Sequence, residues 1–361
     1  MAFRLDESEL FVGRSAALPS DTREIDSVPI LISLKDEVID LATWVEQTNV
    51  GDMTIGHLAD VTRRLAVDYL EKPPVPILRE ATTLYRRVSA LLRAGRQHLR
   101  QTRDLYIIAG QLLAFVSWAS SDLGQTGAAE AYARTGWVLA EQADHNGLRA
   151  LVLIAQSKNA FWERRYHDAG EYARRGHEYA PATEARVLLA CQEADAWQAL
   201  GDLGRAREAM GRAEAAREVI NGRTDPGGIW ECGLGRQANY AIGVSLRAGD
   251  PAEALALAEL AREAYTTERR PYGTWAQICI GAGIARVMTG EPEAAARELM
   301  PIFALPANQR LATVTARLGE VDERLRERRY SRDFPARALQ EQIADYRASA
   351  ITSRALTTGA E

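Results

Sequence analysis

A short pattern recurs five times along this chain. Each copy begins at a loop residue, with a small residue five positions later and a small or apolar residue nine positions later. The copies begin at Gly124, Arg164, Gly201, Gly249 and Gly290, so their spacing is 37 to 48 residues. A period of this length with helical patterning is typical of stacked helix hairpins. The pattern therefore predicts the architecture, and leaves the function open.

The third copy shows why the pattern predicts two packed helices. Gly201 breaks one helical run, and Ala206 and Met210 lie on the inner side of the next. Glycine adopts the left-handed turn conformation at little cost, because it has no Cβ atom. Small side chains let two helix backbones approach closely. The second copy differs, since Arg164 stands where glycine is expected, and we expect one irregular turn there.

These features predict an all-α fold, a right-handed superhelical array of antiparallel helix hairpins. A single hairpin cannot bury its own apolar face, whereas stacked hairpins bury it between them. No sustained Val/Ile/Thr alternation indicates strands. The expected organisation is a loosely ordered arm at 1–29, N-terminal helices in 30–100, five hairpins over 101–306, capping helices over 307–348 and a frayed tail at 349–361.

Two segments interrupt the helical pattern. Residues 71–76 read Glu-Lys-Pro-Pro-Val-Pro. They predict a joint that is not helical at its centre, followed by a helix that starts at residue 76. Residues 221–228, rich in glycine and with one proline, predict a long loop. That loop accounts for the 48-residue spacing between the third and fourth copies.

The charge and hydropathy of the chain restrict the classes of partner and the cell compartment that we expect for it. The net charge is −5, with 44 basic and 49 acidic residues, so nucleic acid is not indicated as the main partner. The chain has no apolar run long enough to span a membrane, and residues 1–10 lack the apolar core of a signal peptide. We expect a cytoplasmic protein that does not enter a membrane.

No motif indicates catalysis. Cys191, Cys232 and Cys279 each lie in an apolar helical run and form no CxxC pair, which favours buried thiols over a disulfide or a metal site. Residues 233–238 match a loose dinucleotide fingerprint, but a turn precedes them where a strand is required. We therefore predict that the chain is not an enzyme and holds no cofactor and no metal.

The candidate binding residues lie on the first helix of each hairpin, which faces the concave side of such arrays. Carboxamides suit a ligand site because they donate and accept hydrogen bonds together. The alternative for each residue is that the amides fill an exposed face and the tryptophans belong to the core. The candidates for a concave ligand-binding groove are Gln111, Trp118, Gln156, Asn159, Trp162, Gln192, Trp197, Arg236, Asn239, Tyr240, Tyr272 and Gln277.

Several stretches resemble one known family. They are residues 102–114, continuing to 133, and residues 155–162, 235–240, 270–273 and 303–306, with residues 69–76 as a similar linker. They are similar to the tetratricopeptide-repeat sensor region of actinobacterial helix-turn-helix transcriptional regulators, of the XRE type. The resemblance covers roughly residues 30–347. Family members usually carry an N-terminal DNA-binding domain. Residues 1–29 are too few for one, so the resemblance implies a sensor module without direct DNA binding.

Two functions remain open from the sequence. The first is a regulatory protein in transcriptional or signalling control, which binds a peptide or a small signal molecule in its groove. Binding would shift the array between two pitches, because the ligand contacts several repeats. The second is a protein–protein adaptor without a small ligand, including a homodimer. Whether residues 1–29 cover the groove is a further open point.

Overall fold

The computed structural model describes the backbone of residues 27–358 and the side chains of residues 34, 35 and 37–350. Within these ranges the chain forms fifteen α-helices and no strand, which confirms the all-α prediction. The chain divides into two units, Met1–Gln47 and Thr48–Glu361. Most of the arm expected at 1–29 and the last three residues lie outside the described residues.

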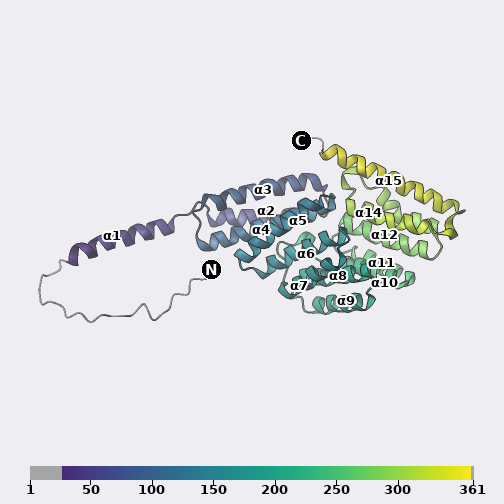
Figure 1. Ribbon diagram of the computed structural model, residues 1–361, viewed down its shortest axis with the longest axis horizontal. Helices are drawn as coiled ribbons and strands as arrows, with labels where there is room; N and C mark the ends of the chain where they lie inside the picture. The colour runs from purple at the N-terminus through teal and green to yellow at the C-terminus, as the bar shows by residue number, and fades with distance from the viewer. Residues whose placement is uncertain (1–26, 359–361) are drawn as a thin grey trace, which may run out of the picture. The chain divides into compact units, whose positions relative to one another are not determined.

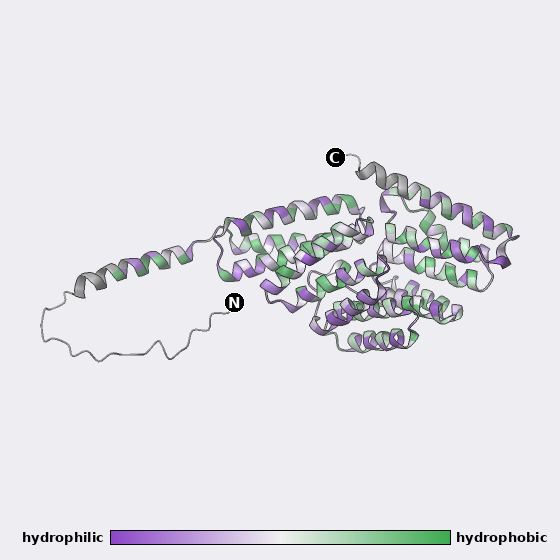
Figure 2. Ribbon diagram, in the orientation of Figure 1, coloured by the Kyte–Doolittle hydropathy of each residue, from purple (hydrophilic) through white to green (hydrophobic). Residues whose placement is uncertain are grey.

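The first unit contains one described helix, α1 (Ser27–Glu46). It begins three residues before the helical region expected from residue 30, so the arm expected at 1–29 was set too long by residues 27–29. Its apolar side chains are exposed: Leu34 is 52% exposed, Leu41 59% and Trp44 69%. Figure 2 shows apolar and polar residues interleaved along this helix.

The second unit begins with α2 (Asp52–Asp68) and α3 (Pro74–Ala94). The joint between them spans residues 69–73 and begins before the predicted segment, because α2 ends at Asp68 and α3 starts at Pro74. Pro76 lies in the first turn of α3. The backbone N–H groups of a first turn have no partner within the helix, so proline loses nothing there. The expectation that the helix starts only at residue 76 was therefore wrong by two residues.

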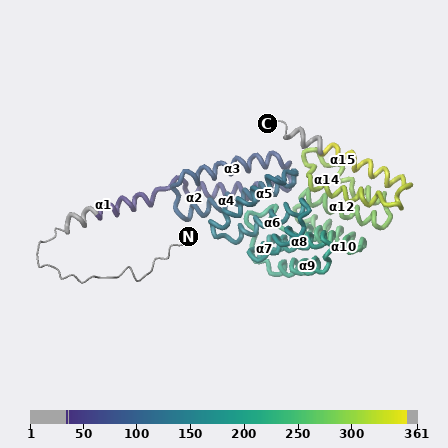
Figure 3. Tube along the Cα trace, viewed as in Figure 1, coloured from purple at the N-terminus to yellow at the C-terminus, as the bar shows by residue number. Residues whose placement is uncertain are grey.

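The five predicted hairpins follow in order, and Figure 3 traces the chain through them. Each pairs one inner helix with one outer helix. They are α4 (Leu99–Asp122) with α5 (Thr126–Gln142), α6 (Asn146–Trp162) with α7 (Tyr166–Tyr179), α8 (Glu184–Leu200) with α9 (Leu203–Glu218), α10 (Leu234–Ala248) with α11 (Pro251–Ala264), and α12 (Tyr272–Met288) with α13 (Pro292–Phe303).

The turn chemistry matches the repeat. The four glycines that begin copies have positive φ, between +78° and +86°. Arg164 has φ +62°, so the irregular copy keeps the same left-handed turn without glycine. The alanines five residues after each turn are fully buried between the paired helices. Close helix approach therefore depends on small residues at these positions.

The inner helices pack in sequence, and the last returns to the first. α4, α6, α8, α10, α12 and α14 (Ala312–Leu325) contact one another in that order, and α14 also contacts α4. The joint between α2 and α3 also contacts the end of the array, because the Tyr272 backbone N–H of α12 donates to the Leu70 carbonyl at 3.3 Å. Gln309 of the 3-10 helix η3 (Ala307–Gln309) donates to the Glu71 carbonyl at 3.2 Å. The two ends of the run of inner helices therefore meet, which limits the space on the concave side. Figure 1 labels the helices of this unit.

The C-terminal helices cover the last hairpin, and α14 also contacts the first. After η4 (Arg328–Tyr330), helix α15 (Phe334–Thr358) packs against α13 and α14. The backbone of α15 continues to Thr358, so the tail expected from residue 349 is helical over most of its length.

The long loop between the third and fourth hairpins is buried over residues 226–230, although the sequence indicated only a spacer. We call residues 219–233 the inner loop. Its 3-10 helix η2 (Gly228–Trp230) packs against α2, and a Cβ atom at Gly228 would collide with the Ala66 carbonyl. Trp230 is fully buried and meets Trp118 edge to face, with ring centroids 5.9 Å apart. The inner loop thus fills part of the concave side.

Candidate functional site

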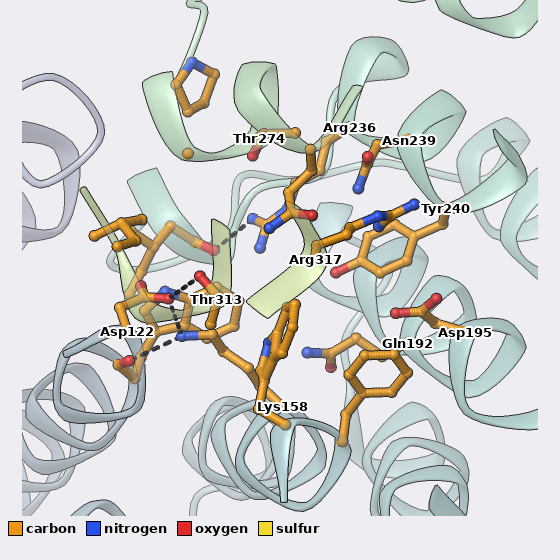
Figure 4. Close-up of a pocket in the computed structure, with 18 of the residues that line it drawn as sticks. Asp122, Lys158, Gln192, Asp195, Arg236, Asn239, Tyr240, Thr274, Thr313 and Arg317 are labelled. Atoms are coloured by element: carbon orange, nitrogen blue, oxygen red, sulfur yellow. Dashed lines mark hydrogen bonds and ion pairs between the residues drawn. The ribbon is translucent and has the colours of Figure 1, made fainter. Parts of the chain in front are cut away.

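A pocket of about 130 Å³ remains inside the array, where the inner helices, the joint and the inner loop meet. Figure 4 shows polar side chains from several inner helices pointing into it. Cavities of this size admit a small molecule, since one of about 150 Å³ binds benzene. Pockets with a few convergent polar groups are the usual form of small-molecule sites.

Eight of the twelve predicted residues line this pocket. They come from the inner helix of every hairpin. They are Trp118 of α4, Trp162 of α6, Gln192 of α8, Arg236, Asn239 and Tyr240 of α10, and Tyr272 and Gln277 of α12.

The other four candidates lie elsewhere. Gln111 donates to Asp225 of the inner loop, with its Nε2 3.2 Å from Oδ2. Asn159 is buried and donates to the Ser117 hydroxyl at 2.9 Å. The Trp197 indole N–H donates to Glu193 at 3.2 Å. Gln156 is half-buried on α6.

The sequence reasoning missed a buried ion pair at the edge of the pocket. Lys158 Nζ lies 2.8 Å from Asp122 Oδ1, and the two side chains are 8% and 6% exposed. Lys158 also donates to the Trp118 carbonyl at 2.9 Å and lies 4.2 Å from the centre of its ring. Burial lowers the pKa of Lys158 to about 8, although Asp122 opposes the change. A lysine within the apolar run of α6 was the available signal.

Asp122 also joins the two ends of the array. It accepts a hydrogen bond from the Tyr69 hydroxyl at 3.0 Å and one from the Thr313 hydroxyl at 3.2 Å. Burial, with Asp122 nearby, raises the pKa of Tyr69. We call Tyr69, Asp122, Lys158 and Thr313 the closure junction. It connects α4, α6, the joint and α14, and each of its members lines the pocket.

Arg236 holds the inner loop against the pocket. Its Nη1 donates to the carbonyls of Ile229 at 2.6 Å and Glu231 at 2.8 Å, and its guanidinium lies 5.2 Å from the centre of the Trp118 ring. A guanidinium has five N–H donors, so these two bonds leave donors for another acceptor.

Two further charged groups face the pocket from opposite elements. Asp195 of α8 accepts from Gln198 at 3.0 Å, and burial raises its pKa to about 6, with Arg317 opposing. Arg317 of α14 has a buried Nε with no hydrogen-bond partner among the described residues. Over the same residues, neither group has an opposite charge within the 4.0 Å of an ion pair.

Several acceptors in the pocket wall also lack partners within the described part of the chain. They are Gln192 Oε1, Asn239 Oδ1, Gln277 Oε1 and the Tyr272 hydroxyl. The Gln192 amide has a fixed orientation, because its Nε2 donates to the Ile154 carbonyl at 3.2 Å. Gln192 is 5% exposed and Asn239 8% exposed. A buried polar group without a partner costs about 1–3 kcal/mol, so this cluster of acceptors and a cation requires an explanation.

The three cysteines are buried free thiols, as predicted. Among the described side chains, residues 34, 35 and 37–350, no group of three or more His, Cys, Asp or Glu is arranged to hold a metal. No helix in the described part of the chain is both long and apolar enough to cross a bilayer. Neither the family models nor the curated proteins searched give a match to the chain.

Proposed function

We propose that this chain is a binding protein that takes up a small polar molecule in the pocket, and that it acts as a sensor in transcriptional or signalling control. The observation that carries the proposal is the set of buried polar groups without partners that face one cavity. A ligand with matching donors and acceptors would satisfy them, which gives affinity and selectivity together.

The enclosed concave side favours a small molecule over an extended peptide. The inner loop and the closure junction occupy space that a peptide would need along the inner helices, and the remaining cavity is about 130 Å³. The proposed ligand therefore contacts α8, α10, α12 and α14 within one pocket.

The proposed output is a change in closure of the array. The pocket is lined by Trp118 near the start of the array and by Arg317 near its end. A ligand that contacts both ends favours the closed arrangement over an open one, by its difference in affinity for the two. The resemblance to regulator sensor regions supports a regulatory role, and we place the protein in the cytoplasm on the same ground.

Native mass spectrometry tests the proposal. The protein is incubated with the dialysable fraction of a cell extract, and the variant with Gln192→Leu and Gln277→Leu is treated in parallel. We expect a low-mass adduct on the unmodified chain that is lost in the variant. Gln156→Leu is the matched control, because Gln156 lies on α6 outside the pocket lining. Absence of any adduct, or an equal adduct in the variant, would contradict the proposal.

The alternative is an adaptor that recruits a second copy of the chain through α1. Leu34, Val38, Leu41 and Val45 follow heptad spacing, and all are more than half exposed. That spacing is the seam of a two-helix coiled coil. Sedimentation would show a dimer that dissociates in the variant with Leu34→Lys and Leu41→Lys. A monomer at all concentrations would contradict this alternative.

A further inference from the structure

Resting on the proposed function, we infer that the ligand is a small zwitterion of the amino-acid type, whose carboxylate pairs with Arg317 while its ammonium group pairs with Asp195. The inference concerns the chemical class of the ligand. It depends on the charges that face the pocket and on the acceptors beside them.

The cationic side of the pocket is Arg317. It lies on α14, lines the pocket, and keeps a buried Nε without a partner among the described residues. A guanidinium that is partly buried and unpaired is costly, and its planar donors match a carboxylate. Arg236 adds a second positive charge on the pocket wall. It is anchored by two backbone carbonyls rather than by a carboxylate.

The anionic side is on α8. Asp195 and Gln192 lie three residues apart on one face of the helix, and both line the pocket. Gln192 Oε1 is a buried acceptor without a partner in the described part, and so is Asn239 Oδ1 on the adjacent helix α10. An ammonium group has three donors, which can be shared among the Asp195 carboxylate and these two amide oxygens.

The separation of the two charges selects a zwitterion. Asp195 and Arg317 influence each other electrostatically, but they are not within the 4.0 Å of an ion pair. A molecule that carries both charges can bridge them and leave neither unpaired. A dicarboxylate could pair with Arg317 and Arg236, but it would leave Asp195 without a cation. A simple amine would leave Arg317 without an anion. The cavity of about 130 Å³ suits a molecule of amino-acid size.

Calorimetric titration with the proteinogenic L-amino acids, one at a time, tests the class. Each binder is compared with its C-terminal amide, which lacks the carboxylate, and with its N-acetyl form, which lacks the cation. We expect at least one free amino acid to bind, and both derivatives to bind about tenfold more weakly or worse, because each leaves a pocket charge unpaired.

Two variants assign the charges. Arg317→Gln should abolish the preference for the free acid over the amide, and Asp195→Asn should abolish the preference for the free amine over the N-acetyl form. Gln156→Leu is the control and should keep both preferences. If no amino acid binds while the extract still gives the adduct described above, the zwitterion inference is overturned and the proposed function stands. If neither gives binding, both are overturned.

Discussion

At the scale of single residues, a buried ion pair lies at the contact between the two ends of the array. Asp122 pairs with Lys158 and accepts two further hydrogen bonds, so one carboxylate on α4 connects this helix to α6, the joint and α14. A buried ion pair contributes little by itself, but removal of one partner leaves an uncompensated charge. The closure junction therefore contributes specificity of arrangement more than net stability.

The variant Asp122→Asn tests this account of the closure junction. It should lower the free energy of unfolding by about 3–5 kcal/mol, because Lys158 remains buried without its anion. The double variant with Lys158→Met should recover much of the loss, since both charges are then absent. Urea unfolding followed by circular dichroism measures both. Equal stability of Asp122→Asn and the unmodified chain would contradict this account of the junction.

The raised pKa of Asp195 makes the stability of the fold depend on pH. Burial raises it from 3.8 to about 6, so the folded state binds this proton more tightly than the unfolded state does. The contribution of Asp195 to stability is therefore largest below about pH 4, and it falls as the pH rises to about 6. The groups that act on it are Arg317 and Glu320 of α14, with Tyr166 and Tyr240 nearby.

The measurement is the free energy of unfolding of the unmodified chain minus that of Asp195→Asn, recorded across this pH range. Contributions of the other titrating groups largely cancel in the difference. We expect the difference to become less favourable to the unmodified chain as the pH rises. A difference in the free energy of unfolding that does not change with pH would contradict the raised pKa of Asp195.

The same group affects ligand binding. Binding of a zwitterion should weaken as the pH falls through about 6, since the Asp195 carboxylate is then neutralised.

At the scale of elements, the inner loop is the least expected part of the molecule. It runs from α9 to α10 and buries Trp230 against Trp118. Trp230→Ala should destabilise the second unit by about 3–5 kcal/mol, the usual loss for a fully buried large side chain. Thermal unfolding and limited proteolysis within residues 219–233 measure the effect.

Trp44→Ala is the matched control for that variant. Trp44 is a tryptophan that is 69% exposed on α1, so we expect a change within about 0.5 kcal/mol. If both variants behave alike, the inner loop does not stabilise the array as its burial indicates.

The elements also show what the sequence could predict. Periodicity, turn glycines and buried alanines depend on neighbours in the chain, so the five hairpins followed from the repeat. The same periodicity placed Gln192 and Asn239 on inward faces. Arg317 lies beyond the repeats, and its place in the pocket depends on α14 meeting α4. That closure is a contact between remote segments, which a pattern along one helix does not encode.

At the scale of the whole second unit, closure converts an open groove into a pocket. The sequence predicted a superhelix with a concave binding face, and the structure confirms the helical array. In an array of stacked hairpins, each hairpin contacts mainly its neighbours, so the two ends are free to separate. Here Thr313 and Tyr69 meet on Asp122, and the pocket lies directly beside this contact.

Hydrogen–deuterium exchange at the closure junction tests the central claim most directly. The backbone amides near Tyr69 and Thr313 are followed with and without the molecule that forms the low-mass adduct. The account predicts slower exchange at both segments on binding, and no change in the variant with Gln192→Leu and Gln277→Leu. Binding that leaves exchange at both segments unchanged would contradict the claim that ligand uptake in the pocket holds the array closed.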